Sequence, residues 1–184
     1  DTGLSAWNLA MGSQELYDWL DAEPQLFHPG DLDYIHSVER ISKLSNVISI
    51  NGGVQLDLMG QENAESTGTR QLSGVGGQMD FLEGAYRSKG GKGFICINSS
   101  RVTKDGERKS NILATIPGGS TISAPRTMIQ YVATEYGIAS LSGKTLRERA
   151  EAMASIAHPD FREELMKYCL LYTSPSPRDR TRSR

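Results

Sequence analysis

The stretch NVISINGGVQLDL, residues 46–58, decides the fold class of this chain. Residues 46–51 are rich in β-branched side chains, which is typical of a buried strand. The pair Gly52-Gly53 breaks that strand, and residues 54–58 then alternate apolar and polar side chains. This alternation predicts a second, half-buried strand directly after the turn.

The rest of the chain interleaves further helices and strands with this stretch. Apolar spacing predicts the helices, and apolar runs between turn signals predict the strands. The expected helices are residues 14–21, 37–44, 79–87, 145–156 and 160–168, and the expected strands are 4–11, 94–97, 112–116 and 128–134, with a charged hairpin at 102–109 and loops at 23–33 and 62–70. This order indicates an α/β domain with an open, mixed or mostly parallel sheet flanked by helices.

Composition excludes several classes of protein. The chain has 184 residues, of which 38% are hydrophobic and 23% charged, which excludes a disordered or collagen-like chain and fits one domain. Its apolar runs are far shorter than the ~20 residues of a membrane span, so no membrane partner is expected. The formal net charge of −2 gives no basic field, so no nucleic acid partner is expected either.

Cysteine and histidine spacing argues against a disulfide framework and a metal centre. Two cysteines favour a reducing, cytoplasmic location, and Cys96, inside an apolar strand, is expected to be buried. His28, His36 and His158 lack the spacing of a zinc site, so no metal is expected. A G-x-S-x-G nucleophile elbow is also absent from the sequence.

The last 16 residues differ in composition from the rest of the chain. Residues 169–179 resemble a translated sequencing adapter, so residues 169–184 are expected to be a disordered artefact outside a domain of residues 1–168. Without this tail the net charge is −5 and one cysteine remains. The alternative is a genuine, solvated basic tail. The chain also begins at Asp1 without a methionine, and we expect a fragment.

The segment GVGGQMDF, residues 74–81, is the first candidate binding motif. It is not a dinucleotide fingerprint, because Met79 stands where the third glycine is required. Adjacent glycines let backbone N–H groups approach a ligand oxygen, and the start of a following helix assists them. A tight loop that packs a helix on a strand explains the motif equally well.

Other candidate segments favour structural roles. Five residues separate Gly137 from Gly143 where a phosphate loop has four, so we expect a strand-to-helix loop with Lys144 or Thr145 near the cap. The segment KGGKG, residues 89–93, could meet phosphates, but a solvated turn is more common. Glu135 ends a strand, where α/β sites gather, or else it caps a turn.

Four segments in this order resemble the acetyl-CoA hydrolase/transferase family. They are GVGGQMDF (74–81), SKGGKGFICINSS (88–100), VATEYGIASLSGKTLRERAEAM (132–153) and IAHPDFREEL (156–165). The resemblance runs from about residue 9 to residue 168. It points to the carboxy-terminal CoA-transferase domain, in the branch of butyryl-CoA and 4-hydroxybutyrate CoA-transferases.

The resemblance implies a ping-pong transfer of coenzyme A between an acyl-CoA and a short carboxylate such as acetate. Coenzyme A is then a substrate, and no covalently bound cofactor is expected. A glutamate attacks the thioester and passes through an anhydride to a glutamyl-CoA thioester. That glutamate belongs to a His-Thr-Glu-Met type segment that this sequence lacks. Glu15, Glu62 and Glu135 do not fill the motif, so no catalytic nucleophile is assigned.

The resemblance also places five residues at the oxyanion and coenzyme A side of the site. Gly77, with Gly76 beside it, offers a backbone N–H to the thioester carbonyl, and Val54 contacts coenzyme A. Lys92 is a further candidate for the coenzyme A side. His36 stands where the family often has an oxyanion-holding asparagine, and it could donate a hydrogen bond instead.

Two alternatives to a CoA-transferase stay open: an acetyl-CoA hydrolase, and a non-catalytic CoA-binding module. In each case the resemblance implies an amino-terminal domain of the same protein as a partner. Because that domain and the glutamate are missing, the chain alone is expected to be inactive. A missing domain should also leave an exposed apolar patch. Homo-oligomerisation stays an open alternative.

Overall fold

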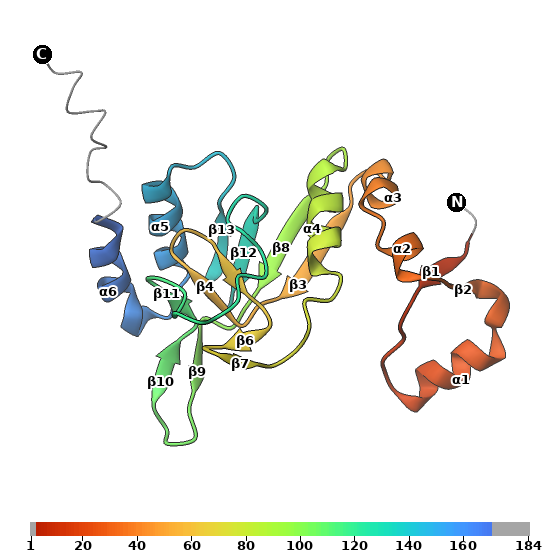
Figure 1. Cartoon of the computed structure of the whole chain (residues 1–184), viewed down its shortest axis with the longest axis horizontal. Helices are drawn as coiled ribbons and strands as arrows, with labels where there is room; N and C mark the ends of the chain where they lie inside the picture. The colour runs from red at the N-terminus through yellow and green to blue at the C-terminus, as the bar shows by residue number, and fades with distance from the viewer. Residues whose placement is uncertain (1–2, 171–184) are drawn as a thin grey trace, which may run out of the picture.

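A four-stranded sheet lies at the centre of the structure, a computed structural model that describes residues 3–170 (Figure 1). Its strand order is β13-β12-β8-β3. Strands β3, β8 and β12 run parallel, and β13 pairs antiparallel with β12. The bounds are β3 (Ile48–Gly52), β8 (Lys92–Cys96), β12 (Tyr131–Thr134) and β13 (Gly137–Ser140). The predicted α/β fold with a mixed sheet is confirmed.

Helices cover one face of this sheet. Helix α4 (Gln78–Arg87) packs on β3 and β8, and α5 (Leu146–Ser155) packs on β13. The side chains on the covered face are buried, Ile95 and Val132 among them. Helix α6 (Pro159–Cys169) packs against α5. The opposite face carries exposed apolar side chains.

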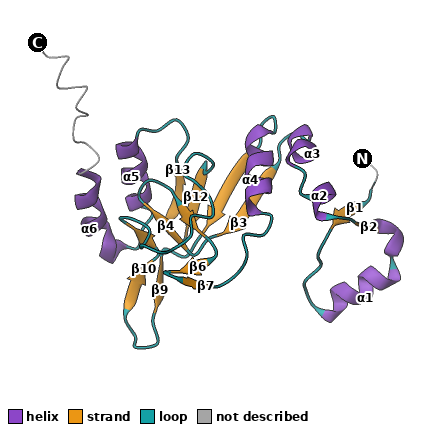
Figure 2. Ribbon diagram, viewed as in Figure 1, coloured by secondary structure: helices purple, strands orange, loops and turns teal. Residues whose placement is uncertain are grey.

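A second, smaller sheet completes the core. Its order is β11-β4-β5, with β11 parallel and β5 antiparallel to β4. Leu56, Leu58 and Ile112 are fully buried in this part of the core. Two hairpins extend from it (Figure 2). The bounds are β4 (Gln55–Asp57), β5 (Glu62–Asn63), β6 (Ser66–Thr67), β7 (Arg70–Gln71), β9 (Ser100–Val102), β10 (Arg108–Ser110) and β11 (Ile112–Leu113).

The amino-terminal residues form an arm beside this body, at the red end of the chain in Figure 1. Strands β1 and β2 form a two-stranded parallel sheet, and α1 has no buried residue. Helix α3 joins the arm to the body, because Ile41 packs so closely on α4 that a Cβ at Gly84 would lie 2.4 Å from it. The bounds are β1 (Ser5–Trp7), α1 (Gln14–Ala22), a 3-10 helix (Pro24–Leu26), β2 (Phe27–Pro29), α2 (Leu32–Ile35) and α3 (Val38–Lys43).

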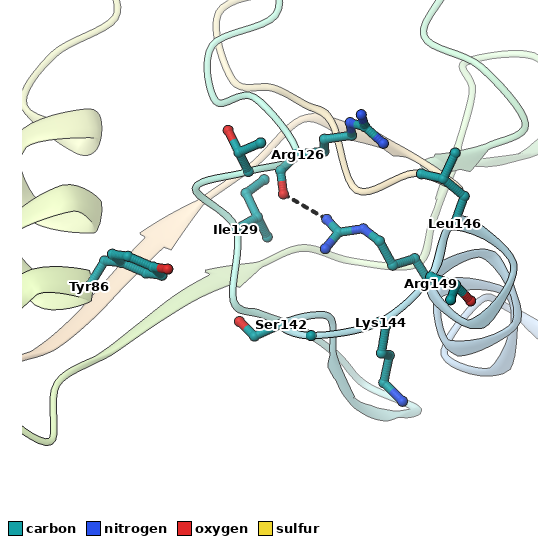
Figure 3. A pocket seen from close by; sticks show the side chains of 10 residues that line it. Tyr86, Arg126, Ile129, Ser142, Lys144, Leu146 and Arg149 are labelled. Carbon is teal, nitrogen blue, oxygen red and sulfur yellow. Dashed lines mark hydrogen bonds between the residues drawn. The ribbon is translucent and has the colours of Figure 1, made fainter.

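Buried Arg149 on α5 connects three segments that are separate in the sequence. Its guanidinium donates to the carbonyl oxygens of Met59 at 2.7 Å, Leu141 at 2.8 Å and Arg126 at 2.8 Å. Figure 3 shows the last of these bonds beside an open pocket. The bond to Leu141 is buried and the other two are partly buried, so the guanidinium satisfies backbone acceptors in and beside the core.

The structure corrects several expectations from the sequence. Cys96 is exposed, not buried, because it lies on the uncovered face of the sheet. Strands lie within the loops expected at 23–33 and 62–70, and β13 was not expected. The predicted cap is confirmed: Thr145 is the N-cap of α5 and forms a capping box with Glu148.

The tail expected to be an artefact falls largely outside the described residues. Cys169 ends α6 and is buried, whereas residues 171–184 are not described. Among the described residues, no helix has both the length and the apolar character needed to cross a bilayer.

We predict that Arg149→Ala destabilises the fold by about 3 kcal/mol, because one buried and two partly buried carbonyls lose a charged donor. Urea unfolding of the chain measures the change. Arg147→Ala is the control, since the salt bridge of Arg147 in the described part of the chain is with Glu151, and both side chains are exposed. Equal stability of the two variants would contradict this account of Arg149.

Candidate functional site

The carboxyl ends of the three parallel strands meet at one edge of the sheet. An open cavity of about 410 Å³ lies there, lined by Gly53 after β3, Asn98 after β8 and Glu135 after β12. Ligands of open α/β sheets bind at this kind of edge. The cavity therefore marks the edge where substrate is expected.

Glu135 is held in place beside this cavity. Its carboxylate accepts hydrogen bonds from the backbone N–H of Ser99 at 2.9 Å and from the Ser99 hydroxyl at 2.6 Å. Desolvation raises the pKa of Glu135, but the hydrogen bonds from Ser99 outweigh it and lower the pKa overall. Glu135 is therefore an ionised, anchored carboxylate.

The glycine-rich loop and His36 line a second cavity, of about 720 Å³. Gly76 has φ +61°, a left-handed conformation that favours glycine, and Gly77 is the N-cap of α4 with no side-chain cap. A Cβ at Gly77 would lie 2.3 Å from the His36 ring, so only glycine allows this approach. The sequence expectation placed these three residues in one site, and the structure brings them together.

The start of α4 has the chemistry of an oxyanion site. The first N–H groups of a helix have no acceptor within the helix, and the N-cap residue Gly77 has no side chain to cap them. Such N–H groups stabilise negative charge that develops on an oxygen. His36 lies beside them, with Nδ1 at 3.8 Å from the Asp80 carboxylate and its ring edge-on to Phe81 at 5.0 Å.

Glu62 connects the Val54 loop with the glycine-rich loop. Its side chain accepts a hydrogen bond from Gln78, the residue after Gly77, and a Cβ at Gly53 would lie 2.9 Å from its other carboxyl oxygen. The backbone N–H of Val54 donates to the carbonyl of Asn63 at 3.0 Å. Glu62 thus fixes the two loops relative to each other.

Glu62 is a neutral acid at neutral pH. The side chain is fully buried, and Oε1 has no hydrogen-bond partner among residues 3–170. Burial raises its pKa to about 8, although the hydrogen bond from Gln78 acts in the opposite direction. Sequence reasoning missed the burial of Glu62, because residues 62–70 were expected to be a polar loop. The only available signal was a glutamate just after a buried strand and a glycine turn.

Lys92 lies apart from the other candidates. It begins β8 and pairs with Ile48 at the start of β3. Because β3 and β8 are parallel, Lys92 is at the opposite edge of the sheet from Gly53 and Val54. A role for Lys92 on the coenzyme A side stays a prediction.

The raised pKa of Glu62 predicts a pH-dependent stability. Between about pH 4.5 and pH 8 the unfolded chain ionises Glu62 while the folded chain keeps its proton. The unfolded state then binds fewer protons, so stability falls as the pH rises through this window and is constant above it. We expect Glu62→Gln to remove this slope and to be more stable than the parent chain by roughly 3 kcal/mol at pH 7.

Urea unfolding between pH 4 and pH 9 measures this difference. The parent and Glu62→Gln should converge near pH 4, where both states of the parent hold the proton. Glu163→Gln, whose side chain is exposed on α6, is the control and should keep the parent's slope. Parallel curves for the parent and Glu62→Gln would contradict the assignment.

Comparison with known proteins identifies the family of this chain. A family model described as the acetyl-CoA hydrolase/transferase C-terminal domain matches residues 12–169. The butyryl-CoA:acetate CoA-transferase of Anaerostipes caccae is 45% identical over 158 residues, 86% of this chain and 35% of the relative. The 4-hydroxybutyrate coenzyme A transferase of Clostridium kluyveri is 47% identical over 156 residues, 85% of this chain and 35% of the relative.

A solved structure and a more distant relative extend the comparison. The crystal structure of RipA from Yersinia pestis superposes with a TM-score of 0.80 at 38% identity, covering 91% of this chain and 37% of that one. An acetyl-CoA hydrolase of Kluyveromyces lactis is 30% identical over 160 residues, 85% of this chain and 29% of the relative. The chain thus spans about a third of the length of the relatives it matches. It belongs to the acetyl-CoA hydrolase/transferase family, whose carboxy-terminal domain it carries.

Proposed function

We propose that this chain is the carboxy-terminal part of an acyl-CoA:carboxylate CoA-transferase. Butyryl-, propionyl- or 4-hydroxybutyryl-CoA is the donor and acetate the acceptor. The observation that carries the proposal is the glycine-rich start of α4 beside His36, in a chain of this family. Two relatives named CoA-transferases at 45% and 47% identity support a transferase over a hydrolase, because the hydrolase named above is 30% identical.

The proposed reaction proceeds through covalent intermediates on a glutamate. The glutamate carboxylate attacks the thioester carbonyl, the C–S bond breaks, and an acyl-glutamyl anhydride and CoA thiolate result. The thiolate attacks the glutamyl carbonyl, the C–O bond of the anhydride breaks, and the acyl group leaves as its carboxylate while a glutamyl-CoA thioester remains. Acetate then attacks the glutamyl-CoA thioester, and the same steps run in reverse with an acetyl group. Acetyl-CoA is released and the glutamate carboxylate is restored. Two easier steps replace one difficult transfer in each half-reaction.

This chain contributes the stabilising side of the site. Each tetrahedral intermediate carries an oxyanion, and the N–H groups at Gly76 and Gly77 are the donors we assign to it. His36 would add a donor from the same cavity. Val54 would contact coenzyme A. The nucleophile lies outside this chain: Glu62 is fully buried and bonded to Gln78, and Glu135 is bonded to Ser99.

Two alternatives differ in what they predict. In an acetyl-CoA hydrolase, water would attack the glutamyl intermediate. A non-catalytic CoA-binding module would bind coenzyme A without turnover.

The free thiols of Cys96 and Cys169 favour a reducing compartment, and we propose the cytoplasm.

A chimaera tests the proposal, with this chain in place of the matching carboxy-terminal third of the Anaerostipes caccae enzyme. We expect acetate-dependent formation of acetyl-CoA from butyryl-CoA, at least tenfold faster than release of free coenzyme A without acetate. Hydrolysis that does not depend on acetate would favour the hydrolase. Coenzyme A binding without either reaction would favour the non-catalytic module.

We predict that the chain alone is inactive, because it contributes donors to the site but no nucleophile. The same exchange assay with the purified chain of residues 1–184 measures this. Acyl transfer above the buffer rate would contradict the proposed division of the site.

We predict that Gly77→Ala in the chimaera lowers kcat/KM at least tenfold, because the new methyl group would displace His36 and the adjacent N–H donors. Gly74→Ala is the matched control, since a Cβ at Gly74 meets nothing within 4 Å. Equal kcat/KM values for the two variants would contradict the role of the glycine-rich loop.

A further inference from the structure

The uncovered face of the central sheet is apolar. Ile48 and Ile50 on β3 are 52% and 68% exposed, and Ile138 on β13 is 63% exposed. Phe94 on β8 and Tyr131 on β12 lie between them, with stacked rings 4.8 Å apart. Ile50, Phe94 and Tyr131 are partners in register across β3, β8 and β12. Ile48, which pairs with Lys92, and Ile138, which pairs with Ala133, lie on the same side of the sheet, so the five residues form one continuous surface, here called the open face.

A mostly parallel sheet with one open face is unusual. Parallel strands form sheets that are covered on both faces, since their crossover helices and neighbouring elements bury them. Here α4 and α5 cover the opposite face, where Ile95, Val132 and Ala139 are buried. No helix or strand of the described residues covers Ile50 or Ile138. The open face therefore has the composition and geometry of an interior surface.

We propose that the open face is the docking surface for the amino-terminal part of the full-length protein. This rests on the proposed function in taking the chain as part of a longer enzyme. The matching relatives are about three times as long as the matched region, and the matched region is the carboxy-terminal domain, so the remaining polypeptide precedes it.

The position of the open face agrees with that occupant. Strand β3 is one of the two outermost strands of the sheet and its first strand in the sequence, so the preceding polypeptide enters the sheet through this strand. Two of the three most exposed isoleucines lie on β3. An aromatic pair flanked by aliphatic side chains is the usual centre of a stable interface.

The alkylation rate of the Cys96 thiol indicates whether the open face is covered. It is exposed and pairs in register with Ala133, on the same side of the sheet as Phe94. Cys169 is buried, and desolvation raises the pKa of its thiol, so its alkylation is expected to be slower. Iodoacetamide labelling, followed by peptide mapping, therefore measures access to the open face.

The test compares the chain of residues 1–184 with the chimaera described above. We expect Cys96 to be alkylated at least tenfold more slowly in the chimaera. Ile50→Lys, and independently Ile138→Lys, should restore the rate of the chain alone in the chimaera. Val102→Lys is the matched control, since Val102 is 60% exposed on the β9–β10 hairpin away from this sheet. It should leave Cys96 protected.

Several outcomes would overturn the proposal. Cys96 labelled equally fast in the chimaera and the chain would mean that the upstream part does not cover the open face. Cys96 of the chain alone could instead become more protected as the concentration of the chain rises, and Ile50→Lys could abolish that protection. This result would assign the open face to a second copy of the chain. The labelling result is separate from the activity result. Protection of Cys96 without CoA exchange would reject the proposed function and keep the docking surface. CoA exchange without protection of Cys96 would keep the proposed function and reject the docking surface.

Discussion

The parallel pairing of β3, β8 and β12 is the constraint on which the rest of the structure depends. Because the three strands run in one direction, the segments that follow them emerge at one edge of the sheet. Gly53, Asn98 and Glu135 meet at that edge for this reason. The crossover from β3 to β8 runs back through α4, which brings the start of that helix to the same edge.

Sequence patterns predicted the elements that depend on local periodicity. The helix expected at 145–156 is α5, and its capping box follows from a threonine placed three residues before a glutamate. The strand expected at 46–51 is β3, within two residues at its start and one at its end. These elements have apolar spacing that their own sequence determines, so distant contacts did not change them.

Other features depend on contacts between distant residues, and the sequence pattern could not give them. Cys96 lies in an apolar strand, but periodicity does not say whether both faces of a sheet are covered. Glu62 is buried because α4 and the segment around Ala124 pack over it. His36 and Gly77 are 41 residues apart, and only the family resemblance suggested that they meet.

The three hydrogen bonds of Arg149 have a consequence for the order of folding. They join α5 to carbonyls 8, 23 and 90 residues away in the sequence. The longest of these loops has to close before the guanidinium gains its full set of acceptors, and that closure has an entropic cost. We therefore expect the network to form late in folding. Interactions that form after the transition state lower the unfolding rate more than they raise the folding rate.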